Sequence, residues 1–170
     1  MATLSVMDFY SVLLNKGLAK PTLYEVIIPG MDQEGAMYCS TMTKPGKNLT
    51  PRNTFPHGIG ITTPQGATWA HEQTTLTFYL SENHYEYQFF EEWMNRVYSN
   101  DNKRLNYLDT YVEDIDIKQV DRANNTTYEC TLIDAFPTNY SNIEYGYGLT
   151  DSVQTFNVLL SFYDKRERFF

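Results

Sequence analysis

The three histidines and a short run of acidic residues are the side chains in this sequence best suited to bind a metal ion or to transfer protons. His57, His71 and His84 lie in unrelated contexts and share no spacing typical of a zinc site. Glu113, Asp114 and Asp116 come closest to a pair of catalytic carboxylates. Successive side chains of a strand point to opposite faces, however, so a solvated strand surface explains these acids better than a catalytic pair.

Sequence motifs for covalent or nucleotide chemistry are also missing. The chain contains no GxSxG nucleophile motif, no Walker-type phosphate loop and no GxGxxG dinucleotide motif. The glycine pairs at 58–60 and 146–148 are too short to indicate more than permissive backbone. We therefore predict that the protein is not an enzyme, and that it binds neither a cofactor nor a metal ion.

Composition indicates one acidic, folded domain. A chain of 170 residues with 42% hydrophobic residues can bury a single core, and its 14 Tyr and 10 Phe favour strands and interfaces. The formal charge of −8 argues against tight binding to nucleic acid through phosphates. Cys39 and Cys130 lie in alternating apolar stretches, which predicts buried, reduced thiols. No apolar run approaches the roughly 18 residues that a membrane span requires.

Two segments have the periodicity of amphipathic helices. The first lies between Ser5 and Gly17, and the second covers residues 83–99. In the second, Asn83 and Glu86 form a plausible capping box, and the nearby acids suit the helix dipole or solvent. The aromatic stripe of this helix has core spacing, so we interpret it as packing surface and not as a ligand site. It consists of Phe89, Phe90, Trp93, Met94 and Val97.

The remaining periodic segments alternate as strands do. We expect two hairpins, one isolated strand, and a final strand that follows a turn at Pro137. Their ranges are 22–30 paired with 36–43, then 72–81, then 111–121 paired with 126–137, and finally 154–162. The predicted fold is mainly β, an antiparallel β-barrel or sandwich with two flanking α-helices.

Residues 44–71 differ from the rest of this predicted single domain, residues 1–170. The segment holds four of the seven prolines and four of the nine glycines, and its formal charges are Lys44, Lys47 and Arg52. No acid occurs from residue 35 to residue 71. So long a stretch without clear periodicity is typical of a mobile loop or of a contact arm, and we expect an extended arm here.

The ends of the chain resemble the tail tube proteins of T4-like contractile-tailed bacteriophages. The similarity lies in GLAKPTLYEVII at residues 17–28, and in FPTN at 136–139 followed by VQTFNVLL at 153–160. The order of predicted elements matches the family over nearly the whole chain. Residues 44–71 and 138–151 have no residue-level match.

This resemblance implies a structural virion protein. In the family, six subunits form a ring whose strands join into a continuous inner barrel, and the rings stack into a tube through which DNA is ejected. The implied partners are further copies, the tail sheath protein, the baseplate tube initiators, and the tape-measure protein and DNA in the lumen. The protein would be assembled in the host cytoplasm and would reside in the virion tail, without membrane contact.

Charge and strand alternation suggest which residues line the channel and which contact neighbouring subunits. Six copies at −8 each would carry −48, and a negative channel repels phosphates so that DNA slides. We expect Lys44, Lys47 and Arg52 to contact acidic surface on a neighbouring subunit. Asp114, Asp116 and Lys118 share one strand face, which we assign to the channel or to solvent. Residues 164–170 are basic and aromatic, and they are either a second contact or a frayed end.

Two alternatives remain open at this stage. A monomeric β-barrel that binds a small apolar ligand would use the many aromatic residues to line a cavity. A baseplate tube initiator or a secretion-system tube protein would share the fold and the ring. Self-assembly separates the tube subunit from the ligand-binding barrel.

Overall fold

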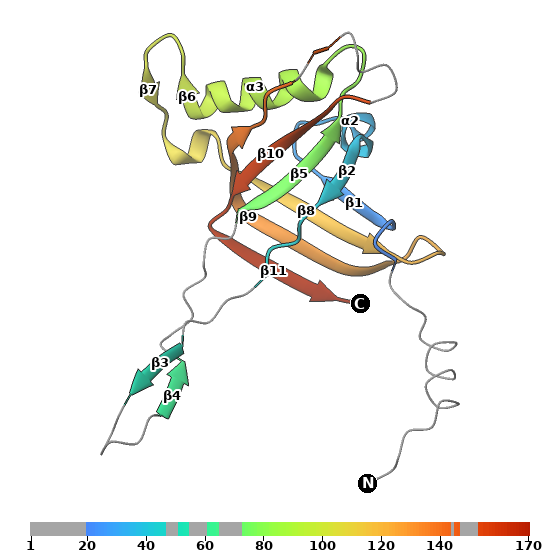
Figure 1. The fold of residues 1–170 in the computed structure, drawn as a ribbon, viewed down its shortest axis with the longest axis vertical. Helices are drawn as coiled ribbons and strands as arrows, with labels where there is room; N and C mark the ends of the chain where they lie inside the picture. Colours follow the sequence, from blue (N-terminus) through green and yellow to red (C-terminus); the bar gives the residue numbers. More distant parts are fainter. Residues whose placement is uncertain (1–19, 47–50, 55–60, 65–72, 144, 147–152) are drawn as a thin grey trace.

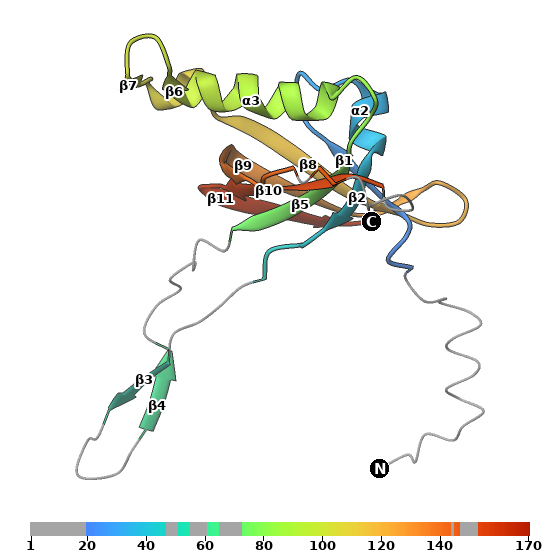
Figure 2. The same cartoon turned by 45° about the horizontal axis from the view of Figure 1, so that its top comes forward.

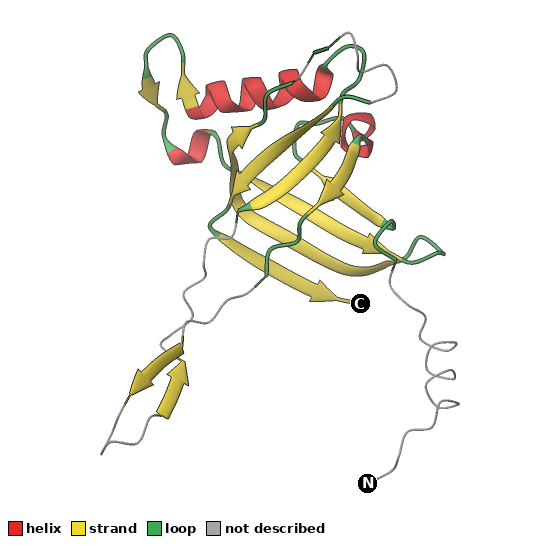
Figure 3. Ribbon diagram, in the orientation of Figure 1, coloured by secondary structure: helices red, strands yellow, loops and turns green. Residues whose placement is uncertain are grey.

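The computed structural model shown in Figure 1 describes residues 20–46, 51–54, 61–64, 73–143, 145–146 and 153–170. The helix predicted between Ser5 and Gly17 lies outside these residues. Within them the chain is mainly β, as predicted, with short helices interspersed (Figure 3). The elements are β1 (Tyr24–Ile27), α2 (Gln33–Met37), β2 (Cys39–Met42), β3 (Pro51–Thr54), β4 (Ile61–Pro64), β5 (Thr74–Tyr79), α3 (Tyr85–Val97), β6 (Tyr98–Ser99), β7 (Arg104–Leu105), the 3₁₀ helix η2 (Leu108–Thr110), β8 (Glu113–Val120), β9 (Thr126–Tyr140), β10 (Thr155–Ser161) and β11 (Asp164–Phe169).

Two antiparallel sheets share the long strand β9. We call the first sheet A; it has the order β1-β8-β9-β11. Sheet B contains the second half of β9 and continues through β10 and β5 to β2. Figures 1 and 2 show the two sheets stacked as layers, with α3 covering one end of the sandwich.

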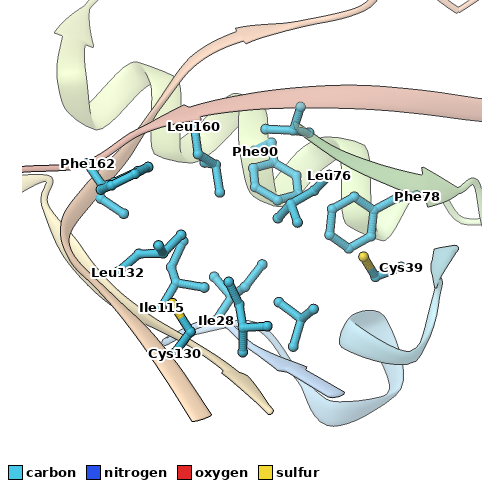
Figure 4. Close-up of a cluster of buried hydrophobic side chains, with 14 of the residues drawn as sticks. Ile28, Cys39, Leu76, Phe78, Phe90, Ile115, Cys130, Leu132, Leu160 and Phe162 are labelled. Carbon is cyan, nitrogen blue, oxygen red and sulfur yellow. The ribbon is translucent and has the colours of Figure 1, made fainter. Parts of the chain in front are cut away.

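The core lies between these layers and beneath α3 (Figure 4). Alternate side chains of β8 and β10 point inward, and the residues between them face outward. The rings of Phe78, Phe90 and Phe156 lie 5.2 to 6.1 Å apart and are at most 1% exposed. This confirms the aromatic stripe of α3 as core, because its rings fill the interior together with those of the sheets.

The start of α3 differs from the predicted capping box. The N-cap position is His84, whose backbone is left-handed (φ 54°) and whose side chain makes no capping hydrogen bond. Ser81 takes that role instead, because its Oγ accepts a hydrogen bond from the Tyr85 amide at 3.3 Å. Glu86 accepts hydrogen bonds from the Ser81 amide and hydroxyl. Glu86 thus helps to cap the helix, as predicted, but its partner is Ser81 and not Asn83, and its side chain is only 1% exposed.

Two further expectations about the strands are wrong. The segment at 22–30 does not pair with the segment at 36–43: β1 pairs with β8 and β2 pairs with β5, while α2 occupies the turn predicted between them. Pro137 does not form a turn, because it lies inside β9 opposite Leu160, beside a register irregularity. A bulge is one of the few places in a sheet where the missing proline N–H is tolerated.

The last residues of the chain form a strand and not a frayed end. β11 runs antiparallel to the first half of β9, from Asp164 opposite Ile133 to Phe169 opposite Tyr128. Other elements follow the predictions closely: β5, α3, β8, β9 and β10 fall within three residues of the predicted bounds. Cys39 and Cys130 are free and buried, as predicted.

The arm predicted at 44–71 contains a small hairpin of its own. β3 and β4 pair antiparallel from Pro51 opposite Pro64 to Thr54 opposite Ile61, and they join neither sheet. Both Figure 1 and Figure 2 show this hairpin away from the sandwich.

Candidate assembly interface

The outward face of sheet A carries most of the charge found on the two sheets. Its charged members alternate along the strands with core residues: they are Glu25, Asp114, Asp116, Lys118, Glu129, Asp164, Arg166 and Arg168. Acids occur on all four strands of the sheet, and the bases are Lys118 on β8 and two arginines on β11. The corresponding face of sheet B presents mainly small polar side chains, with Thr77 donating to Asn157 at 2.8 Å.

Asp114, Asp116 and Lys118 share the outward face of β8. Each is tied to the neighbouring strand β9. Asp116 Oδ1 accepts a 2.6 Å hydrogen bond from the Thr131 hydroxyl, and Asp114 Oδ1 accepts one from the Asp134 amide at 3.1 Å. The Lys118 ammonium lies 3.7 Å from a Glu129 carboxylate oxygen. The three side chains therefore form an ordered, charged strip on this face.

Sheet A ends in two strands that run in opposite directions. β1 is antiparallel to β8, β8 to β9, and β9 to β11, so β1 and β11 are antiparallel to each other. Among the described residues, no strand pairs with the outer edge of either. Exposed strand edges of this kind present unpaired backbone N–H and C=O groups, which readily pair with another chain.

A groove of about 490 Å³ lies along β1, between this strand and α2. Its apolar lining includes Ile27, Met31, Met37 and Val120. Met37 is 82% exposed, and Ile27 is also exposed. The free edge of β1 therefore adjoins partly apolar surface, which burial against another chain would stabilise.

The residues predicted to make inter-subunit contacts fall in different environments. Lys44 follows β2 at the root of the arm, and Arg52 lies on β3. Lys47 lies outside the described residues. The Lys44 ammonium is 3.5 Å from Glu167 Oε1 and 3.9 Å from the centre of the Tyr128 ring, and the side chain remains half exposed. Lys44 thus has partners within its own chain.

A compact polar cluster on β11 and β9 surrounds this Lys44 contact. Glu167 Oε1 accepts a 2.8 Å hydrogen bond from the Tyr128 hydroxyl and lies 3.4 Å from the Lys165 ammonium. Lys165 also donates to the main-chain oxygens of Pro45, at 2.7 Å, and Gly46, at 3.2 Å. The hydrogen bond from Tyr128 and the neighbouring ammonium groups of Lys165 and Lys44 lower the pKa of Glu167, although burial opposes them.

Burial and the same carboxylate raise the pKa of Tyr128, because an ionised phenol would face a negative charge. Lys165 and Glu167 lie in the segment 164–170, which the sequence offered as a second contact or a frayed end without singling out either residue. The sequence feature that could have identified them is the two-residue alternation of β11. In this strand Lys165 and Glu167 face one side of the sheet, and Arg166 and Arg168 face the other.

Nothing in the described part of the chain resembles a metal centre, since no group of three or more His, Cys, Asp or Glu side chains lies close enough to hold an ion there. His84 lies at the start of α3, while His57 and His71 are outside the described residues. No helix within those residues is both long enough and apolar enough to span a membrane.

Solved structures of contractile injection machines share this fold. A chain of the sheath-tube complex of PVC, an extracellular contractile injection system, matches with a TM-score of 0.68 at 12% identity, covering 99% of this chain and 100% of that chain. The sheath/tube terminator of the same system matches with a TM-score of 0.69 at 12% identity, covering 89% and 96%. The tube-terminating cap of the anti-feeding prophage matches with a TM-score of 0.67 at 12% identity, covering 90% and 92%.

The fold is thus one found in the tubes and caps of contractile injection systems. No curated protein sequence matches this chain. The phage tail tube protein family matches residues 9–165, and the chain belongs to this family. Family membership confirms the resemblance found in the sequence, and it makes the protein a structural component and not an enzyme.

Proposed function

We propose that this protein is the subunit of the inner tube of a contractile tail, that six copies close into a ring, and that stacked rings form a channel for DNA ejection. Membership of the tail tube family supports the tube role. The fold shared with a chain of an extended sheath-tube complex supports a partnership with a sheath. The single observation that carries the ring is the arrangement of the two free edges of sheet A.

Those edges are suited to closure by rotation. In a ring with cyclic symmetry, β11 of one copy meets β1 of the next. Because β1 and β11 are antiparallel within one copy, they are also antiparallel across the junction, and the alternation of strand direction continues around the ring. Closing sheet A on itself pairs both of its edges, which removes the risk of uncontrolled pairing there.

The charges on the two edges are complementary. Arg166 and Arg168 point outward from β11, and Glu25 points outward from β1. Opposite charges on neighbouring antiparallel strands contribute about 0.2–1 kcal/mol per pair. At this junction Arg166 of β11 can face Glu25 of the next copy, whereas Arg168 already lies 3.7 Å from Glu129 within its own chain.

In this ring we place the outward face of sheet A on the channel. Asp114 and Asp116 then contribute to a wall on which acids outnumber bases, with Lys118 tied to Glu129 beside them. Such a wall repels phosphates, so DNA and the tape-measure protein pass without being held. The opposite arrangement, a basic wall, would bind DNA tightly and impede ejection.

The arm and the outer surface supply the remaining contacts. We assign the cationic arm, through Lys47 and Arg52, to acidic surface on a neighbouring subunit or ring, with Lys44 at its root. The sheath surrounds the tube, and baseplate initiators start it. Assembly takes place in the host cytoplasm, and the finished protein resides in the virion tail.

A ring that caps or initiates the tube is the second candidate. The structures of the PVC terminator and the anti-feeding prophage cap match this chain as well as the tube chain does, with TM-scores of 0.69, 0.67 and 0.68. The number of stacked rings distinguishes the two candidates. A tube subunit adds ring after ring, whereas a cap or an initiator forms a fixed, small number of rings.

Cysteine cross-linking tests the ring junction. Glu25→Cys is combined with Arg166→Cys, and in a second protein with Arg168→Cys, and assembled particles are mildly oxidised. We expect one of the two double variants to give a ladder of covalent products that ends at six copies. The matched control combines Glu25→Cys with Lys103→Cys on the β6–β7 turn, and it should remain monomeric on a denaturing gel. Assembled particles without a ladder from either arginine position would contradict the junction.

A further inference from the structure

The root of the arm is fastened to the C-terminal strand by side chains that have no part in the sheets' own hydrogen bonding. The last ladder bond of β2 is donated by the Thr43 amide to Thr75 O at 3.0 Å, after which the chain leaves sheet B. Residues 44–46 then pass beside β11, as Figure 1 shows. They are held there by Lys165 and Glu167, more than a hundred residues later in the sequence.

The Lys165 side chain is buried against the arm root, although it lies on an edge strand. Its side chain is 6% exposed, and its ammonium group donates to two consecutive main-chain oxygens, those of Pro45 and Gly46. Lysine side chains are seldom buried unless their charge is satisfied. The carbonyls that satisfy it belong to the arm root, so the contact fixes main-chain direction and not merely a side chain.

Glu167 completes the contact from the other side. Its Oε1 accepts a hydrogen bond from the Tyr128 hydroxyl and lies within 3.5 Å of the ammonium groups of both Lys165 and Lys44. Lys44 in turn lies above the Tyr128 ring. The cluster therefore holds three consecutive residues of the arm root: Lys44 by its side chain, and Pro45 and Gly46 by their carbonyls.

We propose that Lys165 and Glu167 are positioning residues for the arm, which set the direction in which it leaves the sandwich before it meets its partner. This inference rests on the proposed function in one respect, because it assumes that the arm makes a contact between copies. An arm that is already aimed loses less conformational freedom on docking, and that favours assembly. A role confined to holding β11 in sheet A would not require bonds to the carbonyls of residues 45 and 46.

The test measures arm direction in the unassembled subunit. Nitroxide labels are attached at Asn53→Cys on β3 and Arg122→Cys in the β8–β9 turn, and their distance distribution is recorded by pulsed electron resonance. Cys39 and Cys130 stay in place, because both are buried and burial raises the pKa of the Cys39 thiol to about 11, which keeps it unreactive. Mass spectrometry confirms that two labels are present.

Lys165→Met removes the ammonium group at nearly constant length, and Glu167→Gln is a milder change that leaves the fold's apolar contacts intact. We expect both to broaden the distance distribution, with loss of the dominant wild-type distance, and Lys165→Arg to restore it in part. Lys103→Met removes the same charge from an exposed turn and serves as the matched control. Distributions equal to wild type in Lys165→Met and Glu167→Gln would overturn the proposal.

Assembly is scored separately by the length of tubes in electron micrographs. Folded Lys165→Met protein should form shorter tubes than Lys103→Met protein at equal concentration. Broadened distances with tubes of normal length would also overturn the proposal, because arm direction would then be irrelevant to docking. If wild-type protein forms no rings or tubes even with tube-initiating baseplates added, the proposed function fails, whereas the distance measurement still decides whether the cluster sets the direction of the arm.

Discussion

Glu86 Oε2 lies 2.8 Å from the Ser81 hydroxyl oxygen and 3.2 Å from the Ser81 amide nitrogen, in a position where the Glu86 side chain is almost completely buried. The Ser81 hydroxyl also accepts a hydrogen bond from the Tyr85 amide, in the first turn of α3. The pair therefore closes the start of the helix that covers the core. The sequence predicted a capping role for Glu86, but it did not indicate that this acid is buried or that Ser81 is its partner.

Replacing either partner should destabilise the protein. Glu86→Ala leaves the Ser81 amide without its acceptor, and a buried unsatisfied group costs about 1–3 kcal/mol. Ser81→Ala should cost about 0.5–2 kcal/mol, the usual range for loss of a cap. Denaturant unfolding of the unassembled subunit measures both. Glu91→Ala, on the exposed side of the same helix, is the control, and an equal loss there would show that the Ser81–Glu86 pair has no special role.

The cluster around Glu167 should make the free energy of unfolding depend on pH in the acidic range. Because Tyr128, Lys165 and Lys44 lower the pKa of Glu167 below its ordinary value of 4.5, its contribution is complete above that value. The contribution is lost as the pH falls through the lowered folded-state pKa. The free energy of unfolding of wild type should therefore exceed that of Glu167→Gln near neutral pH, and the difference should shrink as the pH falls below 4.5 and through the lowered folded-state pKa. A difference independent of pH would contradict this account.

Shortening the arm should separate ring formation from stacking. Deletion of residues 46–56 removes Lys47, Arg52 and β3, but it leaves both sheets intact. We expect folded subunits that still close into rings and fail to elongate, as seen in electron micrographs. A full-length variant with Lys47→Gln and Arg52→Gln keeps the arm but removes its charges. Its stacking should be weaker than that of wild type, and the difference should shrink as the salt concentration rises. Normal tubes from the deletion would refute the role of the arm.

Charge reversal on β8 should slow DNA passage. Asp114→Lys with Asp116→Lys converts part of the proposed channel wall from repulsive to attractive for phosphates. Phage carrying the change should eject its genome more slowly, with the defect reduced at higher salt. Glu82→Lys with Glu91→Lys makes the same charge change near and on α3, and it should leave ejection unchanged. Unaltered kinetics in assembled β8 variants would remove these residues from the channel.

Local pattern predicted the elements whose two faces differ strongly. On β10, Phe156, Val158 and Leu160 are buried while Thr155 and Asn157 are exposed, which is the two-residue alternation visible in the sequence. The α3 stripe was equally plain, because its apolar residues recur with helical spacing. In both cases the core imposes the pattern directly on the sequence.

Pairing partners and the root cluster were not predictable in this way. The alternation of β1 marks it as a strand but does not say that its partner is β8, almost a hundred residues away. β11 carries charges on both faces, so it lacked the apolar alternation that identifies a strand. Lys165 and Gly46 meet only because β11 lies beside the arm root, and no local spacing encodes that meeting.

Negative-stain electron microscopy of the purified protein over a range of concentrations, with its mass in solution, tests the central claim most directly. We expect six-membered rings with an open centre, which stack into hollow tubes as the concentration rises. Rings that never lengthen would indicate a cap or initiator. A protein that remains a folded monomer at every concentration, even with tube-initiating baseplates added, would contradict the claim.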